Sequence, residues 1–346
     1  MKKYFILAAA ALVTLASCVK NDIDQTSQKG REINFNAVAA MATKTPLDGT
    51  TYGTGAPHFG VFSYALADRT PIAGSWDANE SALTPYMDNV EISYDPDDKI
   101  WEPGSVYYWP LSGSLTFIGY SPYMASGVSY TPASKTLTFT NFVQVASADS
   151  QKDLMWATTN KDLQGNQSVY TPGGGTKTGV NIVFHHALSQ VVFAIKKDAG
   201  LSGYVIKVKS ISFNANSKAT LNVTNDVPAW GAASENLTYT VGDEDQAATD
   251  AAFEQYGSAH MPVPQTLTAG TQQFSVTYSL ETTAGLALGQ KTATFNLRTD
   301  SVTAWAQNTK YTYNLLIGLE QIYFNPTISE DWGTASSNVD VPEDHV

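Results

Sequence analysis

The sequence predicts an all-β protein built from two β-sandwiches in tandem. Apolar and polar side chains alternate with a period of two along most of the chain, and no sustained helical period of 3.6 residues is found. The 346 residues include 7 Trp, 18 Tyr and 14 Phe, a composition typical of half-buried strands joined by turns. A chain of this length predicts about two domains with a sizeable core.

The predicted strands are segments in which every second residue is apolar, so that one face of each strand is buried. The apolar positions are Ile33, Phe35 and Ala37; Ala219, Leu221 and Val223; Phe274, Val276, Tyr278 and Leu280; Ala293, Phe295 and Leu297; and Tyr311, Tyr313, Leu315 and Ile317. Between 204 and 213 the apolar residues step by three from Val208 to Ile211, which predicts a β-bulge. A short helix is expected around 250–256.

The boundary between the two domains is predicted at a cluster of breakers, Thr171-Pro172-Gly173-Gly174-Gly175-Thr176. We therefore expect an N-terminal β-sandwich over 31–172 and a C-terminal β-sandwich over 173–346. Many short antiparallel strands at this spacing favour two β-sandwiches in tandem.

The N-terminus has the features of a lipoprotein signal peptide over 1–17. Lys2 and Lys3 precede an apolar run that ends at Ala16, too short for a membrane-spanning helix of about 20 residues. The run ends in Leu15-Ala16-Ser17-Cys18, which resembles a bacterial lipobox. We expect lipidation of Cys18, which would anchor the chain to a membrane surface. The polar segment 18–30 is interpreted as a tether.

Charge and cysteine content exclude several classes of partner and site. The 20 Lys and Arg residues are outnumbered by 32 Asp and Glu, giving a formal charge of −12. No basic footprint for nucleic acid is therefore predicted. The single cysteine excludes an intramolecular disulfide framework and a Cys-built zinc site.

No motif predicts an enzyme, a metal site or a cofactor. The run Gly173 to Thr178 lacks the Gly before Lys177 and the following helix that a phosphate-binding loop needs. His185 and His186 are adjacent on a predicted strand and point to opposite faces, so one is expected in the core and one at the surface. The acidic runs 95–98 and 243–245 are expected to be solvated turns rather than calcium loops.

The run from Trp101 to Trp109 is dense in aromatic residues. Two interpretations are open. The rings fill the core of a sandwich, which large aromatic side chains do efficiently, or they form a platform on which sugar rings stack. The first interpretation is favoured.

An ordered series of short segments resembles the fimbrillin-like proteins of Bacteroidales, which include subunits of lipoprotein-derived pili. The segments are Ile33-Asn34-Phe35, Ala42-Thr43-Lys44-Thr45, Phe59 to Tyr64, Tyr107-Tyr108-Trp109-Pro110, Leu115 to Pro122, Asp153 to Ala157, Val183 to Ser189, Pro262-Val263-Pro264-Gln265, Tyr311 to Leu315 and Trp332. The ordered set spans Ile33 to Trp332, and the lipobox lies in front of it.

This resemblance implies two transthyretin-like or Ig-like β-sandwiches and a mode of assembly. A lipidated precursor reaches the outer membrane, and an arginine-specific protease cuts after the first strand. Removal of that strand opens a groove that a strand from the next subunit fills, which is β-strand addition. The implied partners are therefore other pilus subunits, and the implied location is the outer membrane surface or a fimbrium.

Carried over to this sequence, the removable strand is Glu32–Val38, with Ile33, Phe35 and Ala37 facing the core. Cleavage is expected near Lys44, where a lysine stands in place of the arginine that the resemblance predicts. The donated strand would come from the C-terminal region, where 311–319 and 322–324 are the apolar candidates.

Two further features carry expectations. Asp300-Ser301-Val302 matches a short O-glycosylation motif of Bacteroidetes, which makes Ser301 a candidate for modification. A surface lipoprotein that binds host or bacterial glycans or proteins without polymerising is the alternative to a pilus subunit.

Overall fold

The computed structural model describes residues 32–39, 52, 56–66, 75–78, 83–97, 100–110, 113–164, 179–319 and 321–329. Within them the chain is built from β-strands, and the predicted all-β class is confirmed. The α-helix α1 (Ser75–Ala78) has four residues. Single 3₁₀ turns lie at Pro132–Ser134, Ala148–Ser150 and Ala199–Leu201. In the described part of the chain, no helix has the length and apolar character needed to cross a membrane.

The first half forms one strongly curved sheet with the order β2-β3-β4-β1-β10-β8-β5-β9. Because β2 also pairs with β5, the sheet closes on itself. Its strands are β1 (Phe35–Ala39), β2 (Phe59–Leu66), β3 (Leu83–Asp95), β4 (Ile100–Pro103), β5 (Leu115–Ser121), β8 (Met155–Ala157), β9 (Asn160–Leu163) and β10 (Val180–His186). The inside of the closed sheet is filled by aromatic rings, among them Phe35, Phe59, Trp101, Phe117 and Phe184.

The second half packs two sheets face to face. One has the order β16-β11-β21-β22, and the other contains β19, β18 and β12, with β14 and β15 also paired to β12. The bounds are β11 (Gln190–Lys197), β12 (Tyr204–Thr224), β14 (Ser234–Gly242), β15 (Gln246–Ala247), β16 (Glu254–His260), β18 (Gln273–Thr282), β19 (Ala287–Asn296), β21 (Lys310–Ile317) and β22 (Ile322–Ser329). Phe193, Phe213, Phe274 and Tyr313 are in contact in the core between them.

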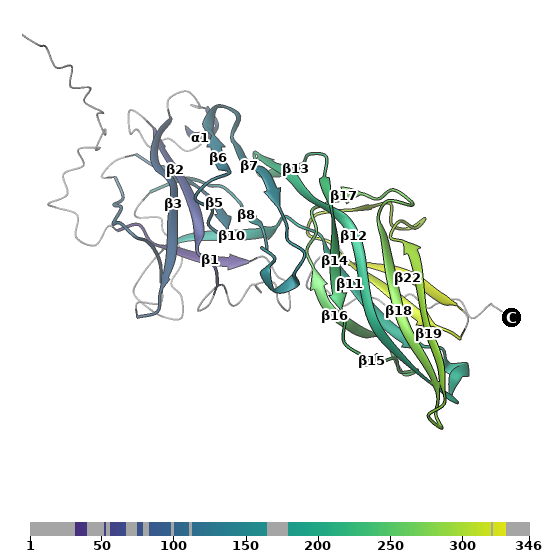
Figure 1. Cartoon of the computed structure of the whole chain (residues 1–346). Helices are drawn as coiled ribbons and strands as arrows, with labels where there is room; N and C mark the ends of the chain where they lie inside the picture. Colours follow the sequence, from purple (N-terminus) through teal and green to yellow (C-terminus); the bar gives the residue numbers. More distant parts are fainter. Residues whose placement is uncertain are drawn as a thin grey trace, which may run out of the picture.

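The strand β12 runs through both halves (Figure 1). Its 21 residues alternate between buried and more exposed positions. The first part of β12 pairs with β18, and its last part pairs with β7 (Thr136–Val143), which continues to β6 (Val128–Thr131). The predicted β-bulge is confirmed, because the register with β18 shifts between Val208 and Ser210. The short strands β13 (Val227–Trp230), β17 (Gln265–Thr266) and β20 (Ala304–Trp305) complete the fold.

Strand pairings cross the position of the expected boundary at 172/173 in both directions. The breaker cluster itself lies outside the described residues, but β10, which follows it, pairs with β1 and β8 of the first half. Conversely, β6 and β7 precede the cluster and belong to the sheet of β12. β10, which ends at His186, is the last strand along the chain to join the sheet of the first half. The sheet that a strand joins is decided by long-range pairing and not by the breakers next to it.

The short helix expected around 250–256 is wrong. The strand β16 begins at Glu254 and pairs with β11, with Tyr256 opposite Phe193. Tyr256 is buried in the core of the second half. The helix-forming residues before it occupy a bend, since pairing with β11 outweighs their weak local preference.

Candidate functional site

The first strand, β1, lies inside the sheet of the first half, between β10 and β4. Figure 1 shows β1 next to β10. Its five residues pair in parallel with β10, from Phe35 opposite Val180 to Ala39 opposite Phe184. On the other side, Phe35 pairs antiparallel with Trp101, which is the one pairing with β4 in the described residues. We call the space that β1 occupies, between β10 and β4, the slot.

Three side chains point into the core, Ile33 just before β1 and Phe35 and Ala37 within it, and they are the set expected from the alternation. Ile33 is 1% exposed, Phe35 is 0% exposed and Ala37 is 8% exposed. The ring of Phe35 meets the rings of Phe59 and Phe117 edge to face, at centroid distances of 5.9 Å and 5.7 Å. Burying one such large side chain contributes about 1.5–3 kcal/mol. A slot without its strand would therefore expose deep apolar pockets.

The backbone amide and carbonyl groups of residues 33–37 point alternately toward β10 and toward the β4 side. The Val180 amide donates to the Asn34 carbonyl at 2.7 Å, so the polar groups of Asn34 face β10. The Ile33 amide donates to the Tyr107 carbonyl at 2.8 Å, on the opposite side. Since successive residues of a strand turn their backbone groups to opposite neighbours, those of Asn36 face β10 and those of Ala37 face the β4 side.

Two details of the slot affect β1 in opposite ways, a close contact at Gly179 and an unpartnered donor at Asn36. A Cβ atom on Gly179 would lie 2.8 Å from the carbonyl carbon of Phe35, so the close approach of the chain before β10 requires glycine. The side chain of Asn36 is 7% exposed, and its Nδ2 has no hydrogen-bond partner in the described residues. A buried donor without a partner costs about 1–3 kcal/mol, so Asn36 weakens the hold on β1.

After β1 the chain returns to the core at Tyr52. The Tyr52 hydroxyl donates to Ser121 Oγ at 2.6 Å, and the Tyr52 carbonyl accepts from Trp101 Nε1 at 3.2 Å. Burial raises the pKa of the Tyr52 hydroxyl well above its usual range. Tyr52 is thus fixed independently of β1. The candidate cleavage residue Lys44 lies in the connection 40–51, outside the described residues.

The two C-terminal segments expected as donors occupy different positions. β21 is an interior strand, parallel to β11 over eight residue pairs and antiparallel to β22 on its other side. β22 is the last strand of that sheet and, among the described strands, pairs with β21 alone. Release of β22 would break one set of pairings, whereas release of β21 would break two.

A sequence profile of fimbrillin-like proteins matches residues 50–332. The chain belongs to the fimbrillin-like family. Solved structures with the same fold include a fimbrial protein from Bacteroides vulgatus, with a TM-score of 0.61, 19% sequence identity, and coverage of 87% of this chain and 99% of that one. Another is a candidate cell adhesion protein from Bacteroides ovatus, with a TM-score of 0.51, 14% identity, and coverage of 89% and 99%. No curated protein sequence matches.

In this fimbrillin-like chain, the aromatic run does not form a sugar platform through its tryptophans. Trp101 and Trp109 are each 3% exposed and belong to the core of the first half. Trp101 contacts Tyr52 and Phe59, and Trp109 contacts Phe117. The favoured interpretation as core residues is confirmed, and stacking of a sugar on either ring would require the core to open.

The histidine pair divides as expected. His186 is 2% exposed, and its Nδ1 lies 3.0 Å from Asp153 Oδ1. His185 points to the other face, where its ring stacks on Trp156 at 4.7 Å and its Nε2 lies 2.9 Å from Thr158 Oγ1. Both rings are therefore engaged within the first half.

Of the two other predicted modification sites, Ser301 and Cys18, the structure describes only Ser301. Ser301 is exposed at a turn, and its Oγ lies 3.1 Å from Thr299 Oγ1. The neighbouring Val302 is buried and its amide donates to Thr299 Oγ1 at 3.0 Å, so the turn is well anchored. Cys18 lies outside the described residues.

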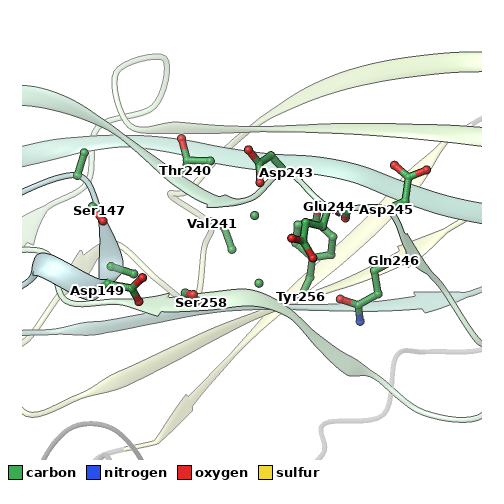
Figure 2. A pocket seen from close by; sticks show the side chains of 14 residues that line it. Ser147, Asp149, Thr240, Val241, Asp243, Glu244, Asp245, Gln246, Tyr256 and Ser258 are labelled. Atoms are coloured by element: carbon green, nitrogen blue, oxygen red, sulfur yellow. Dashed lines mark hydrogen bonds between the residues drawn. The ribbon is translucent and has the colours of Figure 1, made fainter.

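A hollow of about 990 Å³ lies between the ends of β14 and β16 and the loop at 146–149. Figure 2 shows the acidic run 243–245 lining it. Asp245 is paired with Lys209 Nζ at 2.6 Å, and the Tyr256 hydroxyl donates to the Glu244 carbonyl at 3.1 Å. The three acidic side chains are exposed, as expected of a solvated turn. Among the described residues, no group of three or more His, Cys, Asp or Glu is placed to hold a metal ion.

The residues that form the walls of the slot could not be recognised from single segments. Val180, Ile182 and Phe184 have the pattern of a strand, but nothing local identifies that strand as the parallel neighbour of β1. Gly179 lies three residues after the breaker cluster, in a stretch whose sequence resembles a linker. Its contact with β1 is a property of the fold and leaves no signal in the neighbouring sequence.

Proposed function

We propose that this chain is a subunit of a cell-surface fimbrium and assembles by strand exchange. Release of β1 opens the slot, and a strand from another subunit fills it. The observation that carries the proposal is the position of β1. It is an internal strand, yet its core contacts are made by three side chains, and beyond β1 the chain is separately fixed at Tyr52.

The order of residues along the chain links the slot to the proposed membrane anchor. Cys18, the proposed lipid attachment site, precedes β1, and Lys44 follows it. A cut after Lys44 would separate both the lipid and β1 from the rest of the chain. One cleavage would therefore free the subunit from the outer membrane and prepare its slot. A cut at Arg31, which precedes β1, would leave the slot filled.

Strand addition supplies both affinity and specificity in such a slot. The exposed backbone groups of β10 and β4 would bond the incoming strand, and the pockets left by Ile33, Phe35 and Ala37 would select its side chains. The role is structural and adhesive rather than catalytic. The burial of Trp101 and Trp109 argues against the alternative of a glycan-binding protein that uses these two rings.

The proposal is tested by cutting the chain on either side of β1. One variant carries a specific protease site in place of 40–44, and the matched control carries the same site in the tether at 22–26. Light scattering after gel filtration is expected to show oligomers only when the cut follows β1. If both cut chains remain monomeric, assembly by strand exchange is wrong for this protein.

The natural cleavage position is tested on protein recovered from the cell surface. N-terminal sequencing is expected to give a chain that starts near Thr45. A blocked, lipid-modified terminus at Cys18 on all recovered protein would contradict removal of β1.

A further inference from the structure

The two sheets of the second half end on the same side of the sandwich. Among the described strands, β19 is the last strand of one sheet and β22 is the last strand of the other. The ring of Phe295 on β19 meets that of Phe324 on β22 at 5.2 Å between centroids (Figure 1). On the opposite side, β14 and β16 are linked, since His260 Nε2 lies 3.0 Å from the Thr240 carbonyl. We call the side bounded by β19 and β22 the open edge.

The strand β19 presents a row of backbone groups along the open edge. The Leu297 amide donates to the Gln272 carbonyl at 3.0 Å, and every second pair along the regular part of the register is then bonded to β18. The amides of Gln290, Thr292 and Thr294 fall between these pairs and face outward. β19 has ten residues, against a usual strand length of about five or six. A long outer strand of this kind is a template for pairing with another chain.

Lys291 places a charge on the inner face of this outer strand. It lies opposite Tyr278, which is buried in the core of the second half, and residues opposite each other in an antiparallel pair share a face. Lys291 Nζ donates to the Leu319 carbonyl at 2.7 Å, in the connection between β21 and β22. The side chain therefore spans the open edge from one sheet to the other. A strand laid along β19 would enclose this ammonium group, and enclosure of a charge is costly.

A β-bulge near the start of β19 also disturbs the row. Gly289 lies opposite Leu280, but the next residue of β18, Glu281, lies opposite Ala287. Gly289 has a φ of 115°, which favours glycine. Bulges bend a strand and increase its twist, so a regular partner strand can follow β19 over only part of its length.

On β22, a proline interrupts the corresponding row. The Gly318 amide donates to the Gln321 carbonyl at 2.9 Å, and the regular register then puts Pro326 opposite Tyr313 in a pair without mutual hydrogen bonds. The nitrogen of Pro326 therefore faces the open edge and carries no hydrogen. A strand that approached β22 would find no donor at this position.

We propose that Lys291 and Pro326 prevent a second copy of this chain from pairing with the open edge. Each residue protects the outer strand of one of the two sheets, and both sheets end on the same side. The block acts in the uncut chain and does not require release of β1, so it goes beyond the proposed function. In an assembly that grows through the slot, the block would keep neighbouring copies from also joining side by side through their second halves.

The test removes both residues from the uncut mature chain, which carries Cys18→Ser to exclude disulfide-linked dimers. Light scattering after gel filtration is expected to show a monomeric parent and an associated Lys291→Val/Pro326→Val variant. Thioflavin T fluorescence should rise at least tenfold in the double variant. The matched control is Lys207→Val, because Lys207 lies on β12 between β18 and β15. It loses the same charge without freeing an edge and should remain monomeric.

Hydrogen exchange distinguishes edge pairing from misfolding. In the associated double variant, the outward amides of Gln290, Thr292 and Thr294 should exchange at least tenfold more slowly than in the parent, while β18 keeps its protection. Lys291→Arg keeps the charge and should remain monomeric. A double variant that stays monomeric would overturn the inference, as would association accompanied by loss of protection in β18. Because no cut is made at 40–44, neither outcome bears on strand exchange at the slot.

Discussion

Each half of the molecule begins with a strand that lies parallel to a later strand of the same half, yet the two first strands are held differently. β1 pairs with β10 over five residues and meets β4 at one pair. β11 pairs with β21 over eight residues and with β16 on its other side. The core residues Phe35 and Phe193 are both 0% exposed. The difference therefore lies in backbone pairing and connectivity, not in burial.

The proposed function requires that β1 can be removed while the rest of the fold stays intact, and the difference between β1 and β11 is consistent with this requirement. The strand β11 continues directly from β10 and is followed by β12, so its loss would unfold the junction between the halves. β1 is followed only by the connection to Tyr52, which has its own hydrogen bonds. Both backbone pairing with β10 and burial of side chains hold β1 in place, and in β-strand addition both contributions come from the incoming strand.

The largest expected effect comes from removing the central ring of each first strand. Phe35→Ala and Phe193→Ala should each lower the free energy of unfolding by about 3–5 kcal/mol, because each leaves a large cavity in a packed core. Chemical denaturation measures this. Hydrogen exchange should distinguish them, with Phe35→Ala accelerating exchange in β1 and β10 but not in β21. Equal acceleration of β21 by both variants would contradict the contrast between the two strands.

A smaller effect is expected from the glycine that adjoins β1. Gly179→Ala places a Cβ 2.8–3.0 Å from the backbone of Asn34 and Phe35, and the strand must shift. We expect a loss of about 1–3 kcal/mol, in the range of other overpacking changes, and faster release of β1 after a cut at 40–44. Gly203→Ala is the matched control, because a Cβ there meets nothing within 4 Å. If both variants release β1 at the parental rate, Gly179 does not hold the strand.

The smallest expected effect is a loss of folding stability at acidic pH, caused by His260 in the second half. Burial lowers the pKa of His260, whose Nε2 lies 3.0 Å from the Thr240 carbonyl and whose Nδ1 lies 3.1 Å from Gln151 Nε2. The unfolded chain then binds the proton more readily than the folded chain. Stability should fall as the pH drops below about 6.5, by at most about 1.4 kcal/mol per pH unit.

The pH effect is measured from urea midpoints at pH 7 and pH 5. His260→Gln should reduce the difference between the two midpoints relative to the parental chain. An unchanged difference would show that His260 does not control the acid sensitivity. Because Gln151 precedes the second half in sequence, this contact also reports on the junction between the halves.

Much of the local structure could be predicted from residue patterns. The period-two runs predicted the strands at 204–213, 273–282 and 310–317, and the step of three in the first of them predicted its bulge. The buried set of β1 followed from the same rule. These features depend on which face of a strand meets the core, which is readable from a few neighbouring residues. The helix expected at 250–256 failed because its residues have only weak local preferences.

The all-β class, the buried faces of the strands and membership of the fimbrillin-like family were determined by the sequence alone, because periodicity and ordered motifs are local properties. Only the tertiary structure decided that β1 lies beside β10, that β12 joins both halves and that Trp101 and Trp109 are enclosed. The physical reason is that pairing between strands distant in sequence depends on the combined packing of all of them. No single strand carries enough information to choose its neighbour.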